Sequence, residues 1–241
     1  MNIAIIPARL NSSRLPNKVI LDICGSPLIE WVYRQVNKSK LVDRIYIATD
    51  SPKVADIVRG FGGTPIMTSP HHQSGTDRVG EAVEKVEGDI IINIQGDEPL
   101  IDSGLVDRLI EELQSDEVDF VSAMSEIATF EELQNPNIVK VVTDTNRNGI
   151  YFSRYPIPFC RDGDIDISNY RKHIGIYGYT REFLHIYNSL PNSFLEQSEK
   201  LEQLRAIEYG YKIRMVETQY SGIGVDTQED LERVKKILCG E

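Results

Sequence analysis

The first 18 residues constrain the fold of this chain more than any other segment. An apolar run, Ile3–Ile6, leads directly into a loop that contains no acidic side chain and three cations, Arg9, Arg14 and Lys18. Arginine offers phosphate oxygens a planar fork of N–H donors, and lysine offers a compact charge. A buried strand, an anion-binding loop and then a helix are typical of the first unit of a nucleotide-binding α/β domain.

The charge of the whole chain makes this basic loop stand out. The formal net charge is -11 and the isoelectric point is near 4.9. Such a chain repels nucleic acids and anionic membranes, so we expect neither as a partner. The alternative for the loop is three solvated surface cations, the ordinary fate of Arg and Lys. Its position directly after an apolar strand favours phosphate binding instead.

The number and spacing of the cysteines and the hydropathy of the chain indicate in which cellular compartment the protein is expected. Cys24, Cys160 and Cys239 are scattered and form no CxxC pair, so the sequence predicts neither a disulfide framework nor a zinc site. The first strand is expected from residue 2, which leaves no room for a signal peptide. No apolar run approaches the roughly 20 residues of a membrane span. We therefore expect a reducing, cytoplasmic setting.

Short apolar runs alternate with helical patterns through the first 150 residues. The expected strands are Ile3–Ile6, Arg44–Thr49, Thr64–Met67, Asp89–Ile94, Phe120–Met124 and Val139–Val142. The expected helices are Pro27–Lys38, with Ser26 as N-cap, Pro52–Arg59, Thr76–Val86 and Ser103–Gln114. This alternation predicts an α/β fold with a mainly parallel sheet, in one domain spanning 1–241. Ligands of such sheets lie beyond the carboxyl ends of the strands.

The regular alternation of strand and helix patterns ends near residue 150. Two prolines exclude a helix over Tyr151–Pro158, and Arg161–Asn169 is expected to be a polar, mobile loop. The remaining expectations are a strand at His173–Tyr179, a helix at Leu195–Glu208, a strand at Lys212–Val216 and a helix at Gln228–Leu238. We interpret the region of about 150–220 as a subregion for substrate binding, dimerisation or both.

Two carboxylates follow glycines at expected strand ends. Asp97 follows Gln95-Gly96, and Asp226 follows a segment containing Gly222 and Gly224. Together with a triphosphate they could complete an octahedral Mg²⁺ site. The alternatives are a turn at Asp97 and helix capping at Asp226, where Thr227 and Asp230 resemble a capping box.

Further candidate positions are weaker when judged by residue type alone. Ser74-Gly75-Thr76 can cap the next helix, while Gly75 can also let the backbone approach a base or ribose. His173 is a lone histidine in a polar and aromatic region. A charged helix carrying Glu202 and Gln203 would ordinarily be a solvated face.

Read together, these segments resemble the 3-deoxy-manno-octulosonate (Kdo) cytidylyltransferases along nearly the whole chain. The ordered matches include Ile5–Arg9, Ser13–Pro16, Ser74–Arg78, Gln95–Pro99, Tyr151–Arg154, Lys172–Tyr177, Leu201–Arg205 and Val225–Thr227. Three positions depart from the family pattern. Asn17 replaces a usual glycine, Leu10 a common aromatic and Val19 a common proline. Asparagine tolerates left-handed backbone, so the turn at Asn17 is expected to survive.

The resemblance implies a nucleotidyltransferase three-layer fold, a homodimer and transfer of CMP from CTP to the anomeric hydroxyl of Kdo, for lipopolysaccharide or capsule synthesis. It implies that CTP is bound by Ala8, Arg9, Arg14, Lys18, Ser74, Arg78 and Gln95, with Arg9, Lys18, Asp97 and Asp226 as catalytic residues. It further implies that Mg²⁺ is held by Asp97 and Asp226. The implied sugar-binding residues are Arg154, His173, Tyr177, Glu202 and Gln203. Two alternatives stay open: a cytidylyltransferase for an 8-amino or sialic acid sugar, and a non-catalytic nucleotide-binding regulator.

Overall fold

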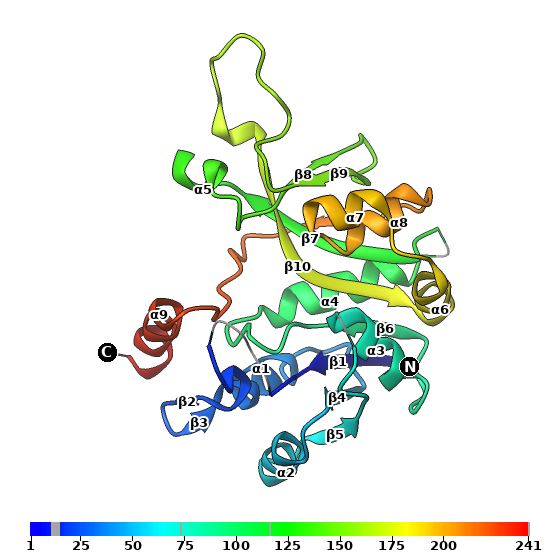
Figure 1. Cartoon of the computed structure of the whole chain (residues 1–241), viewed down its shortest axis with the longest axis vertical. Helices are drawn as coiled ribbons and strands as arrows, with labels where there is room; N and C mark the ends of the chain where they lie inside the picture. Colours follow the sequence, from blue (N-terminus) through cyan, green and yellow to red (C-terminus); the bar gives the residue numbers. More distant parts are fainter. Residues whose placement is uncertain (11–14, 73, 116, 241) are drawn as a thin grey trace. The chain divides into compact units, whose positions relative to one another are not determined.

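The computed structural model describes residues 1–10, 15–72, 74–115 and 117–240. Its contacts divide the chain into two units. Unit 1 comprises Met1–Ile110 together with Gly222–Glu241, and unit 2 comprises Glu111–Ser221. The end of the chain therefore returns to the unit in which the chain begins, which Figure 1 shows as the red helix α9.

The core of unit 1 is a parallel sheet with the strand order β6-β1-β4-β5. Its strands are β1 (Asn2–Pro7), β4 (Arg44–Thr49), β5 (Thr64–Met67) and β6 (Ile90–Asn93). Four successive residues of β1, Ile3–Ile6, are completely buried. Both faces of this strand are thus covered, which explains its continuous apolar run. The strands expected from the sequence in this region are confirmed.

Helices connect these parallel strands, as the alternation of patterns predicted (Figure 1). The connecting helices are α1 (Leu28–Val36), α2 (Pro52–Gly60) and α3 (Gly75–Val83). Helix α4 (Ser103–Leu113) follows β6, and α9 (Gln228–Cys239) comes from the end of the chain. Two helix starts follow sequence rules. Ser51 caps α2 with Pro52 as its first residue, and Ser74 forms a capping box with Asp77 at α3.

The predicted start of α1 was wrong. Ser26 and Pro27 form β3, which pairs with β2 (Asp22–Ile23), and Pro27 is the N-cap without a side-chain hydrogen bond. The hairpin uses the extended conformation that a helix-capping residue also adopts, so local sequence could not distinguish the two. Its turn contains Cys24 and Gly25, both with positive φ.

The absence of a disulfide was also predicted wrongly. Cys24, in the turn of the hairpin, is bonded to Cys239 at the end of α9, across a sequence separation of 215 residues. No local spacing indicates such a pair, because only the return of α9 to unit 1 brings the two cysteines together. Cys160 is a free thiol. The reducing, cytoplasmic setting stays a prediction.

Unit 2 is built on an antiparallel pair, β7 (Phe120–Glu126) and β10 (Arg171–Thr180), with β11 (Arg214–Glu217) parallel to β7. Two more strands, β8 (Lys140–Thr143) and β9 (Gly149–Ser153), pair with each other, and β8 also pairs with β10. The register of β10 against β7 shifts between Ile174 and Tyr177. Such a bulge re-aims the side chains around it.

The helices of unit 2 differ from the sequence prediction. The single helix expected at Leu195–Glu208 is two, α7 (Phe194–Glu199) and α8 (Gln203–Glu208), because Lys200 adopts the left-handed conformation with φ 56° and ends α7. The sequence prediction missed α5 (Phe130–Gln134) and α6 (Arg181–Ser189). The segment between β9 and β10 is a loop with one short 3₁₀ helix, Ile167–Asn169. No described helix is long and apolar enough to cross a membrane.

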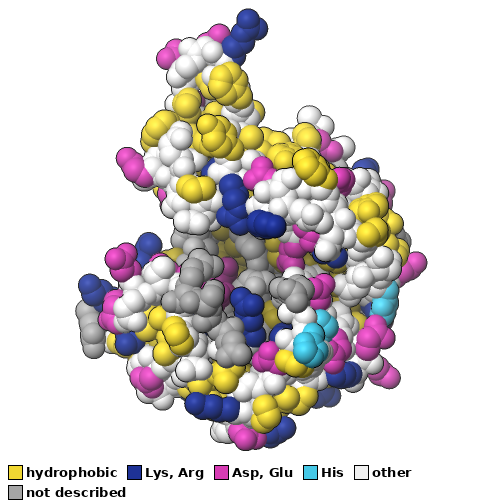
Figure 2. Space-filling view, in the orientation of Figure 1, with side chains coloured by type: hydrophobic (Ala, Val, Ile, Leu, Met, Phe, Trp, Pro, Cys, Tyr) yellow, Lys and Arg dark blue, Asp and Glu magenta, His cyan; other side chains and the backbone are white. Residues whose placement is uncertain are grey.

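Exposed apolar side chains gather on the segment between β9 and β10. Tyr155 is 79% exposed and Phe159 is 86% exposed. Figure 2 shows hydrophobic side chains on this segment, at the top of the view. It lies within the predicted 150–220 subregion, which itself falls inside unit 2.

Candidate active site

Three residues of unit 1, distant in sequence, meet through their charged ends. The Lys18 ammonium contacts the Asp97 carboxylate and lies 2.9 Å from Oδ1 of Asp226. The Lys18 side chain is only 12% exposed, whereas those of Asp97 and Asp226 are 28% and 43% exposed. The two predicted metal ligands thus converge on one point, and a cation occupies it. We call these three residues the charged triad.

Local backbone conformation delivers Lys18 to this point. Asn17 has φ 55° and ψ 28°, the left-handed conformation, and a short 3₁₀ helix, Lys18–Ile20, begins directly after it. The sequence prediction that asparagine would sustain this turn in place of glycine is confirmed.

Backbone contacts bring the two carboxylates together. The N–H of Val225 donates to the carbonyl of Asp97 at 2.9 Å, which ties the segment before α9 to the end of β6. A capping box of Thr227 and Asp230 then starts α9 immediately after Asp226. Gly96 is required for a separate reason, since an added Cβ would lie 2.6 Å from the carbonyl oxygen of Pro7. Gly96 thus lets the segment after β6 lie directly against the end of β1.

The electrostatics of the triad keep Lys18 protonated. Burial alone lowers the pKa of an ammonium group, but the charges and hydrogen bonds of Asp97 and Asp226 outweigh burial and raise the pKa of Lys18 above its ordinary value. The group therefore carries its positive charge at neutral pH, as a phosphate-binding lysine must.

The donor chemistry of the triad suits a hard divalent cation. Two carboxylates already surround one positive charge, and carboxylate oxygens are the protein ligands that Mg²⁺ accepts. Among the described residues, no group of three or more His, Cys, Asp or Glu side chains is placed to hold a metal ion. The protein would thus supply two ligands and leave the other positions to phosphate and water, which is the usual pattern for Mg²⁺ with nucleotides.

The remaining residues predicted for CTP divide into three groups. Ala8 is buried and donates its N–H to the carbonyl of Ala48, while Arg9 is exposed. Ser74 caps α3, where an added Cβ on Gly75 would lie 3.8 Å from the side-chain oxygen of Gln95. The end of β6 and the start of α3 therefore lie side by side. Arg14 lies outside the described residues.

Arg78 has a structural environment that the sequence did not reveal. Its guanidinium donates to Thr68 Oγ1 at 2.5 Å and to Asp50 Oδ2 at 3.1 Å, and its side chain is only 4% exposed. It therefore joins α3 to the ends of β4 and β5. A phosphate contact would require it to leave these partners.

In unit 2 the structure brings together three of the predicted sugar-binding residues, His173, Tyr177 and Gln203. The phenol of Tyr177 donates to Gln203 Oε1 at 3.1 Å, and Gln203 Nε2 lies 3.5 Å from His173 Nδ1. Ser122, which sequence reasoning missed, completes the set, with its hydroxyl 2.8 Å from His173 Nε2 and 2.8 Å from the carbonyl of Ile176. We call these four side chains the neutral chain.

The direction of each hydrogen bond in the neutral chain follows by elimination. Because the single proton of Ser122 goes to the Ile176 carbonyl, its oxygen accepts from His173 Nε2–H. Nδ1 of His173 is then the acceptor for the Gln203 amide, whose oxygen accepts from Tyr177. This assignment makes His173 a neutral imidazole with one defined tautomer.

The charge state of His173 agrees with this geometry. Burial lowers its pKa to about 3, and the ring of Phe152 meets it edge-on with centroids 5.0 Å apart. Both ring nitrogens are engaged and the ring is uncharged near neutral pH. A neutral His173 offers a sugar hydrogen bonds and no positive charge.

Arg154 and Glu202 lie at the junction of α7 and α8. The guanidinium of Arg154 donates to the carbonyls of Glu199 at 2.7 Å and Pro136 at 2.9 Å, and its backbone N–H donates to the Glu199 carboxylate. Glu202 is the N-cap residue of α8, next to Gln203. Glu202 is thus adjacent in sequence to Gln203 of the neutral chain, while Arg154 is hydrogen-bonded to the carbonyls at the end of α7. Glu199, absent from the sequence prediction, holds β9 through Ser153 and Arg154.

Lys140 holds the backbone of Arg154 in place through a hydrogen bond to its carbonyl. It is completely buried and donates to the carbonyls of Asn135, Ile138 and Arg154 at 3.0, 2.6 and 2.6 Å. Burial and the charge of Arg154 lower the pKa of Lys140. All three ammonium protons have acceptors, which gives Lys140 a structural role.

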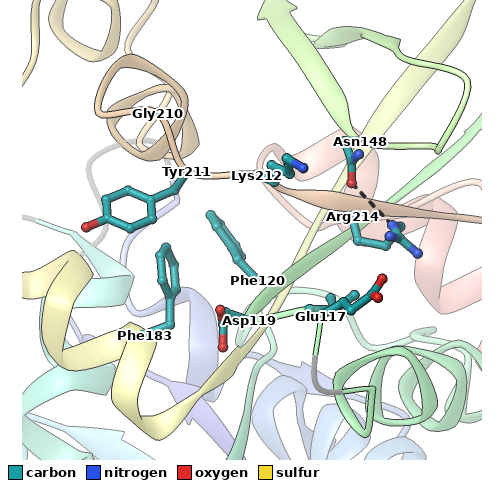
Figure 3. Close-up of a pocket in the computed structure, with 10 residues that line it drawn as sticks. Glu117, Asp119, Phe120, Asn148, Phe183, Gly210, Tyr211, Lys212 and Arg214 are labelled. Atoms are coloured by element: carbon teal, nitrogen blue, oxygen red, sulfur yellow. Dashed lines mark hydrogen bonds between the residues drawn. The ribbon is translucent and has the colours of Figure 1, made fainter.

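A pocket of about 240 Å³ in unit 2 contains none of the predicted site residues. Figure 3 shows Phe120, Phe183 and Tyr211 on one side of it and Asn148 and Arg214 on the other, the last two joined by a 3.3 Å hydrogen bond. It lies at the starts of β7 and β11, away from the end of β7 where β10 presents His173. We therefore do not assign the sugar to this pocket.

Known proteins resemble this chain over nearly its whole length. The family model described as cytidylyltransferase matches residues 3–213. The 3-deoxy-manno-octulosonate cytidylyltransferase of Geobacter sulfurreducens is 45% identical over 249 residues, which cover 99% of this chain and 100% of that protein. The enzyme of the same name from Trichlorobacter lovleyi is 44% identical, with 98% of each chain covered.

This chain belongs to the 3-deoxy-manno-octulosonate cytidylyltransferase family. The resemblance inferred from the ordered motifs is thereby confirmed. Among solved structures, CMP:2-keto-3-deoxy-manno-octonic acid synthetase complexed with CTP matches with a TM-score of 0.94 and 42% identity, covering 100% of this chain and 99% of that one.

A more distant relationship shows only the fold of this cytidylyltransferase. A putative glucose-1-phosphate thymidylyltransferase from Bacillus anthracis matches with a TM-score of 0.69 at 18% identity, with 98% of this chain and 95% of that one covered. The predicted α/β nucleotidyltransferase fold is confirmed.

Proposed function

We propose that this protein transfers CMP from CTP to the anomeric hydroxyl of Kdo and releases pyrophosphate. The observation that carries the proposal is the charged triad. It occurs in a chain that matches a 3-deoxy-manno-octulosonate cytidylyltransferase over the full length of that enzyme. A regulator that only binds nucleotide has no need of two carboxylates converging on one cation. This observation favours the catalytic hypothesis over the non-catalytic one.

On the nucleotide side, the sugar hydroxyl attacks the α-phosphorus in line, and pyrophosphate leaves with its electron pair. Lys18, Arg9 and Arg14 neutralise the charge that grows on the leaving group. Asp97 and Asp226 would hold Mg²⁺, which when bound supplies charge neutralisation and lowers the pKa of the attacking hydroxyl. Each of these roles belongs to a residue that the sequence alone indicated.

The residues that we propose to bind the sugar all lie in unit 2. The neutral chain offers oriented dipoles to sugar hydroxyls, because its donors and acceptors are fixed by one another. Arg154 supplies the positive charge for the sugar carboxylate once it exchanges a carbonyl partner for that carboxylate. Glu202 and Gln203, at the start of α8, would accept hydrogen bonds from hydroxyl groups.

The assay that tests this function measures pyrophosphate release with CTP and Mg²⁺, comparing Kdo, its 8-amino analogue and a sialic acid. Preference for Kdo is the expected result. Preference for either other sugar would move the substrate assignment, and absence of turnover with all three would favour a nucleotide-binding regulator.

Arg154→Ala tests the division of labour between the two substrates. We expect a much larger increase in KM for Kdo than for CTP, with Arg154→Lys recovering only part of the loss because lysine lacks the planar fork. Arg171→Ala is a control, since that arginine pairs with Glu217 and with loop carbonyls. An effect of Arg154→Ala confined to CTP would contradict the division.

We also propose that the protein is a homodimer that buries the apolar segment between β9 and β10. Tyr155 and Phe159 expose large apolar surfaces that a partner copy could cover. Light scattering coupled to gel filtration should give twice the mass of one chain. Phe159→Asp should shift the protein towards one chain, whereas an unchanged dimer mass would place the interface elsewhere.

A further inference from the structure

The charged triad holds a cation where the proposed metal must bind. The ammonium of Lys18 lies 2.9 Å from Asp226 Oδ1 and contacts Asp97 Oδ2. Two carboxylates and one ammonium leave a net charge of about -1, so without a cation the two carboxylates would repel each other at close range. The ammonium of Lys18 therefore offsets this repulsion.

Mg²⁺ and the ammonium cannot occupy this position together. A magnesium ion needs its oxygen ligands at about 2.0–2.1 Å in near-octahedral geometry. One oxygen of each carboxylate, Oδ2 of Asp97 and Oδ1 of Asp226, accepts a hydrogen bond from Lys18, so a metal ion between the two side chains would compete with the ammonium for these atoms. Joint occupancy would bring a dication and an ammonium within a few ångströms, at a high electrostatic cost.

We propose that Lys18 is the resident counter-cation of the metal-free protein and that a divalent cation replaces it between Asp97 and Asp226 when the ammonium moves to the triphosphate. This inference rests on the proposed function only for the identity of the nucleotide. It goes further in making one side chain a competitor of the metal and a ligand of the nucleotide in turn.

The position of Lys18 in the chain is suited to such an exchange. It begins a three-residue 3₁₀ helix directly after a left-handed residue, Asn17, and therefore stands at a turn instead of within a long element. The two carboxylates are held more firmly, through the backbone bond of Val225 to Asp97 and the capping box after Asp226. Lys18, whose ammonium ends a flexible four-carbon side chain, is therefore the member of the triad suited to move.

Two consequences distinguish this exchange from an ordinary ion pair. Because CTP draws the ammonium away, CTP and the divalent cation should bind with positive coupling, and the coupling must be reciprocal. Because Lys18 competes with the metal, removing its charge should tighten metal binding in the absence of CTP, although it weakens the handling of phosphate.

The main experiment measures Mn²⁺ binding to the whole chain by electron paramagnetic resonance, without sugar and without CTP. Lys18→Met should bind Mn²⁺ about tenfold or more tightly than the parent. Lys172→Met is the matched control, because Lys172 is another largely buried lysine paired with a carboxylate, that of Glu132 at 3.1 Å. The control should leave Mn²⁺ affinity unchanged. Equal or weaker Mn²⁺ binding by Lys18→Met would overturn the proposal.

The coupling is read from CTP affinity in EDTA and at saturating Mn²⁺. The affinity for CTP at saturating Mn²⁺ divided by the affinity in EDTA should be markedly smaller in Lys18→Met than in the parent. Chelation of Mn²⁺ by free CTP affects both proteins equally. An unchanged ratio would contradict the exchange. Since no sugar is present, failure here leaves CMP transfer intact, and a different sugar preference leaves the exchange intact.

A measurement on the parent covers the case in which Lys18→Met does not fold. The labelling rate of Lys18 by acetic anhydride, followed by mass spectrometry, should be low without metal because its side chain is only 12% exposed. Mn²⁺ should increase that rate several-fold while the labelling of Lys172 stays constant. A Lys18 rate insensitive to Mn²⁺ would refute the displacement.

Discussion

The charged triad of unit 1 and the neutral chain of unit 2 differ in both charge and burial. The two carboxylates of the triad are 28% and 43% exposed, whereas Ser122 and Gln203 of the neutral chain are buried. The triad concentrates three charges on one point and meets through the ends of flexible or short side chains. The neutral chain carries no net charge and fixes each donor and acceptor against the next. One is arranged for exchange of its central cation, and the other is arranged to stay as it is.

The difference follows from what each region would recognise. A triphosphate and a metal ion are strong, compact charges that can replace an internal ion pair at little net cost. Sugar hydroxyls are weak, directional partners, which are discriminated only by donors and acceptors already held in place. The two regions therefore predict different responses to mutation, to reduction and to pH.

The largest expected effect on stability distinguishes the two units, because the disulfide Cys24–Cys239 lies entirely within unit 1. Cys24→Ser should reduce the free energy of unfolding by about 2–5 kcal/mol, because it frees a long loop in the unfolded chain. Hydrogen exchange read by mass spectrometry should show the loss in unit 1, at α9 and the β2–β3 hairpin, with unit 2 little changed. Cys160→Ser, at the free thiol, is the matched control. Equal protection of α9 in both variants would argue against the disulfide.

Removing one carboxylate of the charged triad should have the next largest effect. Asp97→Asn should lower turnover by about 10²-fold or more, equivalent to roughly 2.7 kcal/mol or more of activation free energy, with Asp226→Asn behaving alike. Circular dichroism should show an intact fold. Near-normal turnover of both variants at saturating Mg²⁺ would eliminate the shared metal site, and Asp102→Asn serves as a carboxylate control outside the triad.

Disrupting the hydrogen bonds of the neutral chain should have a smaller effect than removing a triad carboxylate. It should change the KM for Kdo and not that for CTP. Ser122→Ala removes the acceptor for His173 Nε2–H, at a cost of about 1–3 kcal/mol in stability for the unsatisfied donor. We expect a higher KM for Kdo with that for CTP unchanged. Nitrogen-15 spectra of the imidazole should show loss of the single Nε2–H tautomer. A tautomer unaffected by Ser122→Ala would show that the serine does not position the ring.

The smallest expected effect is the response of His173 to pH. With a pKa lowered to about 3, the ring should stay neutral from pH 8 to 5, so its proton resonances should not shift over that range. The sign for stability follows from the unfolded value of about 6.5. The contribution of the neutral ring is complete above pH 6.5 and is lost as pH falls towards 3. A titration midpoint near 6.5 would disprove the buried, neutral assignment.

Much of unit 1 could be predicted because its signals are local. Strand β1 is a continuous apolar run, and the start of α3 agrees with the capping residues predicted at Ser74-Gly75-Thr76. The turn at Asn17 was predictable for the same reason, since few residues other than glycine tolerate positive φ. Unit 2 was less predictable: the break at Lys200 splits one helical pattern into two helices, and nothing in the local sequence marks it.

The chain's own residues determined which groups are available, and the tertiary structure decided which of them meet. Residue patterns indicated the parallel sheet, the basic loop and the two carboxylates, because periodicity and residue chemistry are properties of short segments. His173 and Gln203 were indicated only by the resemblance of the ordered motifs to the family. Only the folded chain placed Lys18 between Asp97 and Asp226, joined Cys24 to Cys239 and made His173 neutral. These outcomes depend on contacts between residues far apart in sequence, where burial and distance set charge and bonding.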